Sequence, residues 1–136
     1  AKRPVLIVKE QALPFERMLV VYDGSPKSKE ALFVSAYFAG RYGANLYLCA
    51  LDDGTPDLEA EISYAKTYLR KLNLDFEYVL REGEDLADKV LAEAAANRAT
   101  TIVLGGYSGN SLFDRLFGSN IDDLLQKTSL PVLICQ

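Results

Sequence analysis

An apolar run meets a helix start in the segment Arg17-Met18-Leu19-Val20-Val21-Tyr22-Asp23-Gly24-Ser25-Pro26. The apolar residues before Asp23 predict a β-strand. Ser25 can cap a helix whose first turn takes Pro26, and Gly43 can end that helix. A strand that runs directly into a helix is the repeating unit of a parallel sheet, so this segment predicts an α/β fold.

The rest of the chain repeats this alternation of short apolar runs and longer stretches with helical periodicity. Further strands are expected at residues 45–51, 75–80, 100–104 and 131–135, and further helices at residues 57–72, 83–98 and 121–128. The fold class that follows is α/β, with an open, mostly parallel five-stranded sheet, helices on both faces and a Rossmann-like arrangement.

Length and composition describe an ordinary globular domain. The 136 residues suit a single core, and apolar residues make up 49% of them. A net charge of −4 disfavours a nucleic-acid partner, which would need clustered basic residues. No apolar run approaches the roughly 18 residues of a membrane span, and Cys49 and Cys135 fit buried, reduced thiols. We therefore expect a cytoplasmic protein with no nucleic-acid or membrane partner.

The sequence contains no histidine, which excludes several classes of enzyme. Ser-His-Asp and Cys-His catalysis, haem ligation by histidine and nearly all catalytic zinc sites need that side chain. The string at 106–110 ends in asparagine where a hydrolase elbow has glycine, and the chain has neither a P-loop nor a dinucleotide-binding glycine motif. Any chemistry must therefore use carboxylates, hydroxyls, Lys or Arg side chains, or a bound cofactor, and no general base can be identified.

Three loops that leave the carboxyl ends of predicted strands should converge where the strand order reverses, and ligands bind there in open α/β sheets. These loops cover residues 23–25, 51–53 and 105–119. Gly105 and Gly106 let backbone approach a ligand, and Ser119 and Asn120 offer the N–H groups of a helix start. Asp23 can accept hydrogen bonds from ribose hydroxyls. Together these residues predict an anion-binding site.

Four motifs stand in a specific order along the chain. They are Val-Tyr-Asp-Gly-Ser at 21–25, Ile-Val-Leu-Gly-Gly-Tyr-Ser-Gly at 102–109, Leu-Phe-Gly-Ser at 116–119 and Pro-Val-Leu-Ile at 131–134. In this order and spacing, from Arg17 to Cys135, the chain resembles the universal stress protein family. Nucleotide-binding members of that family carry Gly-x2-Gly-x9-Gly-Ser/Thr after the fourth strand. The matching stretch here is Gly105-x2-Ser108-x9-Gly118-Ser119, which keeps the span and replaces the second glycine.

The resemblance implies a domain of the universal stress protein type that binds ATP or AMP. It implies that Asp23 holds the ribose, that the Leu51 backbone meets the adenine, and that the loop after the fourth strand holds the phosphates. The nucleotide-binding residues so implied are Asp23, Leu51, Leu104, Gly105, Ser108, Gly109, Gly118, Ser119 and Asn120. Asp52 and Asp53 could coordinate Mg²⁺ beside a triphosphate, although loop carboxylates are usually only solvated.

Two functions from different classes stay open on the sequence. One is a stress-response module that binds ATP or AMP, and the other is a dimerisation or interaction module with a degenerate nucleotide pocket. Ser108 discriminates between them, since its side chain can crowd a phosphate or its hydroxyl can replace a donor. Asp23 also fits an Asx-type turn, and Ser119 also fits a plain helix cap. Arg115 is expected to be solvated rather than to contact a phosphate.

The two ends of the chain contain an internal sequence repeat. Pro4-Val5-Leu6-Ile7-Val8 nearly duplicates Pro131-Val132-Leu133-Ile134-Cys135. We interpret residues 1–10 as the relic of a preceding domain's last strand and residues 15–136 as the universal stress protein-like domain. The resemblance implies pairing through the last strand, so a homodimer or a tandem-domain pairing is expected. The leading strand could fill part of that edge, in cis or in trans.

Overall fold

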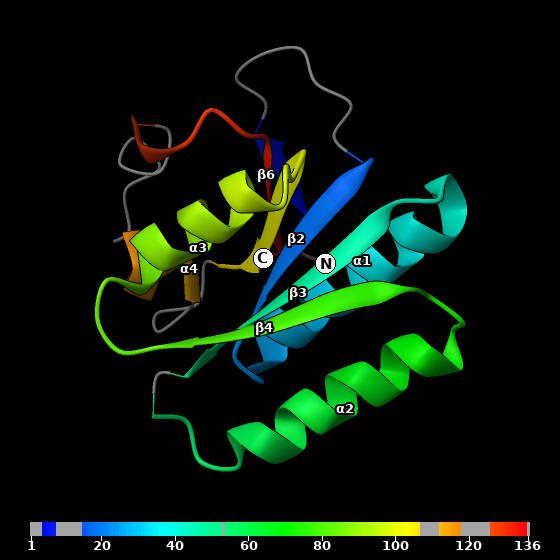
Figure 1. Cartoon of the computed structure of the whole chain (residues 1–136), viewed down its shortest axis with the longest axis horizontal. Coiled ribbons are helices and arrows are strands. Elements are labelled where there is room, and N and C mark those ends of the chain that lie inside the picture. The colour runs from blue at the N-terminus through cyan, green and yellow to red at the C-terminus, as the bar shows by residue number, and fades with distance from the viewer. Residues whose placement is uncertain (1–3, 8–14, 53, 107–111, 118–125, 136) are drawn as a thin grey trace.

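A six-stranded sheet forms the centre of the structure (Figure 1). The structure is a computed structural model that describes residues 4–7, 15–52, 54–106, 112–117 and 126–135. Within these residues the strand order is β1-β6-β5-β2-β3-β4. The strands are β1 (Val5–Ile7), β2 (Arg17–Tyr22), β3 (Asn45–Asp52), β4 (Phe76–Glu82), β5 (Thr101–Gly105) and β6 (Val132–Cys135). Neighbouring strands run parallel, except that β1 is antiparallel to β6.

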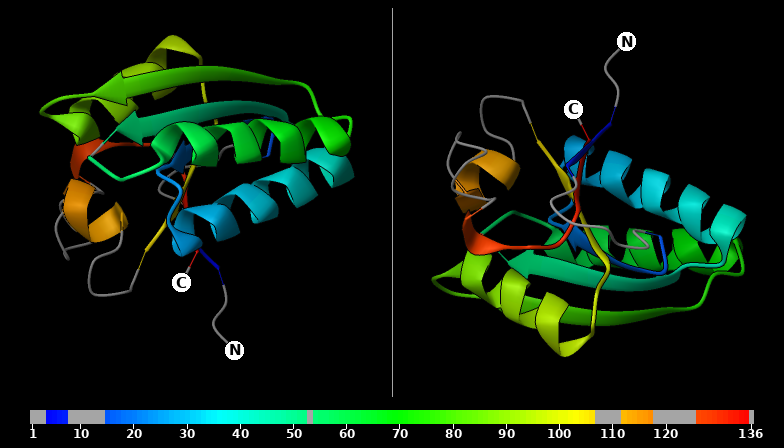
Figure 2. Two further views of the ribbon diagram at one scale, coloured as in Figure 1. Left: turned by 90° about the horizontal axis from the view of Figure 1, so that it is seen from below. Right: turned by 90° about the horizontal axis from the view of Figure 1, so that it is seen from above.

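Helices cover both faces of this sheet. They are α1 (Pro26–Tyr42), α2 (Leu58–Lys71), α3 (Leu86–Ala96) and α4 (Leu112–Phe117). Helices α1 and α2 lie on one face and α3 lies on the other (Figure 2). Phe117 of α4 belongs to the buried cluster that α3 forms with the sheet. The predicted α/β class, with an open and mostly parallel sheet, is confirmed. In the described ranges no helix has both the length and the apolar character needed to cross a membrane.

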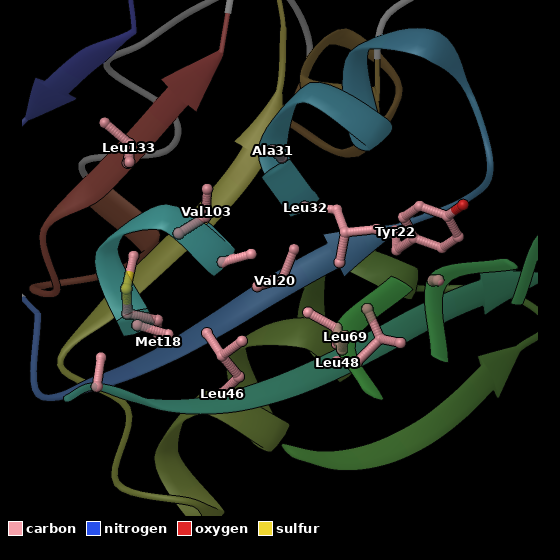
Figure 3. Packing of buried hydrophobic residues seen from close by; sticks show 14 of the residues in the cluster. Met18, Val20, Tyr22, Ala31, Leu32, Leu46, Leu48, Leu69, Val103 and Leu133 are labelled. Carbon is pink, nitrogen blue, oxygen red and sulfur yellow. The ribbon is translucent and has the colours of Figure 1, made fainter. Parts of the chain in front are cut away.

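Alternate side chains of β2 fill two cores. Met18, Val20 and Tyr22 point toward α1 (Figure 3), and Leu19 and Val21 pack on the α3 side. All five side chains are at most 1% exposed, so β2 is buried on both faces, as an interior parallel strand should be. Burying one Val or Leu side chain stabilises the fold by roughly 1.5–3 kcal/mol. The middle strand of the sheet is therefore a rigid base for the loop that follows it.

Local sequence sets both ends of α1 where they were predicted. The Ser25 side chain accepts a hydrogen bond from the N–H of Ser28 at 3.2 Å, and Pro26 takes the first turn. At the other end Gly43 adopts a φ of 72°, and its N–H donates to the carbonyl of Ala39 at 2.9 Å.

Two details of the fold differ from the expectation. The sheet has six strands rather than five, because Val5–Ile7 pairs in cis with β6. Residues 112–117, expected as part of a loop, form α4, since Phe117 is buried in the core and Leu116 packs against it. Most of the helix expected at 121–128 lies outside the described residues. Within its described part, residues 126 and 127 are helical.

A polar network fixes α3 against the sheet. The Glu93 carboxylate, on α3, accepts hydrogen bonds from Tyr47 Oη at 3.0 Å and from Arg81 Nε at 2.8 Å. Asn97 Nδ2 donates to the same carboxylate at 3.2 Å. Burial by itself would raise the pKa of Glu93, but the hydrogen bonds and the charge of Arg81 hold that pKa below its usual value. The network therefore ties α3 to β3 and β4 with a charged group.

The two cysteines are core residues. Cys49 on β3 and Cys135 on β6 are both free and buried, as expected. Burial raises the pKa of the Cys49 thiol to about 12 and that of the Cys135 thiol to about 11. Both thiols are therefore protonated near neutral pH and are poor nucleophiles in the folded chain.

Candidate functional site

The strand order reverses between β2 and β5. From β2 the chain moves outward to β3 and β4, and from β5 it moves in the opposite direction to β6. The loops after β2 and β5 diverge at this point, which is the usual ligand position of an open α/β sheet. Asp23 follows β2 directly and Gly106 follows β5 directly, so these two residues flank the reversal.

Asp23 is a buried residue that starts α1. It is 1% exposed, and its Oδ1 atom accepts the N–H of Ser25 at 2.9 Å. Its own N–H donates to Ser28 Oγ at 3.3 Å. The first of these bonds is the Asx-type turn that the sequence offered as the second interpretation of Asp23. This carboxylate therefore has a structural role that needs no ligand.

The other carboxylate oxygen of Asp23 is paired with Arg115 of α4. Arg115 Nη2 donates to Asp23 Oδ2, and the side chains of the two residues are 34% and 2% exposed, respectively. Burial on its own would raise the pKa of Asp23, but the hydrogen bonds from Ser25 and Ser28 and the charge of Arg115 bring that pKa below its usual value. Asp23 is therefore ionised at neutral pH. The expectation that Arg115 is only solvated was wrong, because a buried carboxylate needs a partner.

Gly24 lets α2 approach the turn after β2. It has a φ of 83°, and a Cβ at this position would lie 2.7 Å from Cγ of Glu61. The backbone carbonyl of Glu61 accepts a hydrogen bond from Tyr22 Oη at 3.1 Å, and its carboxylate pairs with Lys29 Nζ at 2.7 Å. The turn is thus held between the starts of α1 and α2, and only glycine fits there.

The two glycines after β5 already have partners within the fold. A Cβ on Gly105 would lie 2.6 Å from the carbonyl carbon of Lys27, so the absence of a side chain at Gly105 lets the first turn of α1 pack closely against β5. The N–H of Gly106 donates to the carbonyl of Cys135 at 2.9 Å. We expected both glycines to let backbone approach a ligand, and the structure gives each of them a packing or pairing role.

Leu51 and Leu104 can offer a ligand only their backbone, because both residues are 0% exposed. Leu104 pairs with Ile134 in the ladder between β5 and β6. The ladder between β2 and β3 ends at the pair Tyr22–Ala50, whereas β3 continues to Asp52. On its β2 side the Leu51 backbone thus lies past the last ladder pair, at the place where the resemblance puts an adenine.

Several expected site residues lie outside the described part of the chain. They are Ser108, Gly109, Gly118, Ser119, Asn120 and the candidate magnesium ligand Asp53. The carboxylate of Asp52 accepts the N–H of Gly54 at 3.1 Å. Among the described residues no group of three or more Cys, Asp or Glu side chains could hold a metal ion. Of the expected nucleotide-binding residues, the described part of the chain contains Asp23, Leu51, Leu104 and Gly105. They lie at or next to the carboxyl ends of the neighbouring strands β2, β3 and β5.

Arg115 is the site residue that sequence reasoning missed. A signal was present, since Arg115 is the only basic residue between Gly105 and Ser119 and a buried acid at this edge needs a cation. The described site thus consists of an ionised carboxylate, the arginine that is paired with it, and a strand end that extends beyond its ladder.

Comparisons with known proteins agree with this fold. Residues 14–136 match the model of the universal stress protein family. A comparison with curated proteins finds no match. A solved universal stress protein from Archaeoglobus fulgidus DSM 4304 is 23% identical to this chain, with a TM-score of 0.78. The match covers 98% of this chain and 49% of that one, so this chain spans about half the length of that protein.

Two further solved structures cover nearly their whole length. A universal stress protein in complex with cAMP is 22% identical, with a TM-score of 0.70, over 93% of this chain and 98% of that one. A universal stress protein from Archaeoglobus fulgidus in complex with dAMP is 24% identical, with a TM-score of 0.64, over 91% of this chain and 100% of that one. At these identities the likeness shows a shared fold.

Proposed function

Because the chain belongs to the universal stress protein family, we propose that it is a stress-response module that binds ATP or AMP. The nucleotide would lie at the carboxyl ends of β2, β3 and β5. Asp23 would hold the ribose, the Leu51 backbone would meet the adenine, and the loop after β5 would hold the phosphates. Similar structures carry cAMP and dAMP, which supports an adenine nucleotide as the class of ligand.

The observation that carries this proposal is the ionised, buried carboxylate of Asp23 at the strand reversal. A carboxylate there can accept hydrogen bonds from ribose hydroxyls once Arg115 has released Oδ2. Micromolar binding needs about −8 kcal/mol, whereas a hydrogen bond to a charged group contributes about 1.5–3 kcal/mol. Several contacts must therefore act together, and Asp23 alone cannot hold the ligand.

A second candidate function is an interaction module whose nucleotide pocket has degenerated. Three contacts favour it, since each satisfies from within the chain a group that we expected a nucleotide to meet. Arg115 pairs with Asp23, Lys27 packs against Gly105, and the N–H of Gly106 is bound by the carbonyl of Cys135. In that case the same edge of the sheet would be a closed structural element.

Calorimetric titration with AMP and with ATP plus Mg²⁺ separates these functions. Asp23→Asn keeps an oxygen that can accept the Ser25 N–H and removes the charge, so we expect it to weaken nucleotide binding at least tenfold. Asp75→Asn is the matched control, because Asp75 is exposed before the amino end of β4, away from the site. If neither nucleotide binds, co-purifies or raises the melting temperature of the unmodified chain, the interaction module is the remaining function.

Ser108→Gly tests the departure from the family pattern. This substitution restores the Gly-x2-Gly spacing after β5, so a chain whose phosphate loop is only crowded should bind AMP more tightly. An unchanged affinity would mean that the serine hydroxyl replaces the lost backbone approach.

The remaining parts of the proposal concern ions, location and partners. Mg²⁺ would arrive with a bound triphosphate rather than occupy a site built by the protein. A cytoplasmic location is supported by the free thiols of Cys49 and Cys135, since unpaired cysteines suit a reducing compartment. The proposed partners are a small nucleotide and a second domain of the same kind, paired as a homodimer or in tandem through the last strand. For such pairing within a homodimer, β1 would have to leave its place beside β6.

A further inference from the structure

Helices α1 and α2 lie side by side on one face of the sheet (Figure 2), with an open groove of about 450 Å³ between their carboxyl-terminal halves. Its walls are Phe33 and Tyr37 from α1, and Tyr68 and Leu72 from the end of α2. The ring centroids of Phe33 and Tyr68 are 4.9 Å apart. Phe33, Tyr37 and Leu72 are 37%, 65% and 48% exposed. Exposed apolar surface that is gathered in one place is typical of an interaction site.

The floor of this groove is nearly free of side chains. Ala36 and Gly40 lie about one helical turn apart on α1, and both line the groove. A glycine inside a helix is less stable than an alanine. A Cβ on Gly40 would meet no atom beyond its own helical turns within 4 Å in the described chain, so no described neighbour accounts for the glycine. Such a position is suited to the close approach of a backbone from another molecule.

Positive charge is gathered at one end of the groove. Arg41 is four residues after Tyr37, and Lys71 is three residues after Tyr68, so each cation shares the helix face of a groove residue. Both cations are exposed, and within the described ranges neither forms an ion pair. Helices α1 and α2 run in the same direction because they follow the parallel strands β2 and β3, so the negative ends of both helix dipoles lie here as well.

We propose that this groove is a docking site for an amphipathic helix of a partner protein, which carries acidic residues in its first turn and runs antiparallel to α1 and α2. Its apolar stripe packs between Tyr37 and Leu72 and over Gly40. Its acidic first turn lies at Arg41 and Lys71, and the positive end of its own dipole faces the carboxyl ends of both helices. An apolar groove accepts an amphipathic helix through residues at such helical spacing. The groove lies away from the strand reversal, so this inference does not depend on nucleotide binding.

The probe is a synthetic peptide of about 14 residues, the length of α2. It carries leucine at helical spacing, glutamate in its first turn and a fluorophore at its last residue. A second peptide carries lysine in place of each glutamate. Fluorescence anisotropy without nucleotide measures the binding of both peptides to the unmodified chain. We expect the glutamate peptide to bind about five- to tenfold more tightly, because ion pairs and helix dipoles favour it.

Reversal of the protein charges should reverse this preference. For the variant Arg41→Glu with Lys71→Glu, we expect the lysine peptide to bind more tightly than the glutamate peptide. The four affinities form a double-mutant cycle, so a difference in helicity between the two free peptides cancels. Arg98→Glu with Lys127→Glu is the matched control, because both residues are exposed and neither belongs to α1 or α2.

Two substitutions test the groove itself. Gly40→Gln places a long polar side chain over the floor and should weaken binding of the glutamate peptide about tenfold. Glutamine favours a helix more than glycine does, so this chain stays folded. Tyr37→Ser should also weaken binding. Tyr42→Ser is its matched control, since Tyr42 is a 59% exposed tyrosine of the same helix whose ring stacks on Phe15 and Phe38 instead of lining the groove. Melting temperatures show that each variant is folded.

Several results would overturn the proposal. The first is that neither peptide binds the unmodified chain at about 1 mM. The second is that binding is unchanged in a folded Gly40→Gln chain, and the third is that the charge reversal leaves the preference for the glutamate peptide intact. Self-association by light scattering that Gly40→Gln abolishes would show that a second copy of the chain occupies the groove, which also contradicts a helix of a different protein.

Discussion

Arg115 and Asp23 are 92 residues apart in the sequence and form an ion pair that joins α4 to the end of β2. Asp23 Oδ1 accepts the N–H of Ser25 in the turn into α1, and Asp23 Oδ2 accepts from Arg115. A nucleotide that uses Asp23 must therefore compete with a group of the protein itself. Under the proposed function, this competition would lower the affinity for the nucleotide.

Arg115→Ala should strengthen AMP binding by about three- to tenfold, which corresponds to roughly 0.7–1.4 kcal/mol. The reason is that Asp23 Oδ2 becomes available to a ribose hydroxyl. Calorimetry on both chains measures the change, and Lys127→Ala removes an exposed cation as the control. Weaker binding after Arg115→Ala would mean that the guanidinium contacts the ligand instead of competing with it.

The same substitution should lower the free energy of unfolding by about 1–2 kcal/mol. Breaking a fully buried ion pair costs about 3–5 kcal/mol, but Arg115 is about one-third exposed, so solvent screening reduces the loss. Urea denaturation measures it. A loss below about 0.3 kcal/mol would contradict a stabilising pair.

Acid should destabilise the chain through Asp23 and Glu93. Both carboxyl groups have a pKa below their usual values of 3.8 and 4.5. A lowered pKa in the folded state gives stability that is complete above those usual values and is lost as the pH falls through the folded-state values. Urea midpoints from about pH 7 to about pH 3 should therefore fall most steeply below about pH 4.5. Asp23→Asn and Glu93→Gln should each flatten that decline, whereas Asp75→Asn should leave it unchanged.

Two glycine substitutions should have opposite effects on stability. Gly105→Ala places a Cβ 2.6 Å from the backbone of Lys27, and overpacking of this kind costs about 1–3 kcal/mol. Gly40→Ala, in the interior of α1, places a Cβ where no atom lies within 4 Å, so it should stabilise the chain by about 0.5–1 kcal/mol. Thermal unfolding of both variants checks the pair. A stable Gly105→Ala chain would show that α1 can shift away from β5.

The thiols of Cys49 and Cys135 should be unreactive in the folded chain. Their pKa values of about 12 and about 11 leave almost no thiolate at about pH 8. A raised pKa in the folded state also means that stability is complete below the usual value of 9.0 and falls as the pH rises toward the folded-state values. Labelling with a disulfide reagent at about pH 8 should be slow without urea and rapid for both thiols in urea. Rapid labelling of one thiol without urea would show that its strand opens readily.

The sheet and most helices could be predicted because local patterns specify them. Tyr22 to Pro26 combine a strand end, a turn and a helix cap within five residues, and each signal acts over only a few neighbours. The position of Asp23 at the strand reversal could also be predicted, since its place after the first full strand follows from the topology. Its role in binding stays a prediction.

What the sequence left undetermined depends on long-range contacts. An apolar run such as Val5–Ile7 predicts a strand without saying which edge it joins. Arg115 could have been solvated, and its pairing with Asp23 depends on how α4 packs through Phe117. Gly105 and Gly106 were expected to contact a ligand, because a glycine in a sequence indicates that another group comes close to the backbone. The sequence does not show that these groups are Lys27 and Cys135 of the same chain.

The hydrogen bond from Gly106 to the carbonyl of Cys135 tethers the loop after β5 to the final residue of β6. A single hydrogen bond therefore joins the start of the proposed phosphate loop to the carboxyl end of β6. A shift of the β6 register by one residue would break the hydrogen bond between Gly106 and Cys135 and would turn every β6 side chain to the opposite face. A change in the position of the carboxyl end of β6 would therefore also displace Gly106, from which the proposed phosphate loop starts.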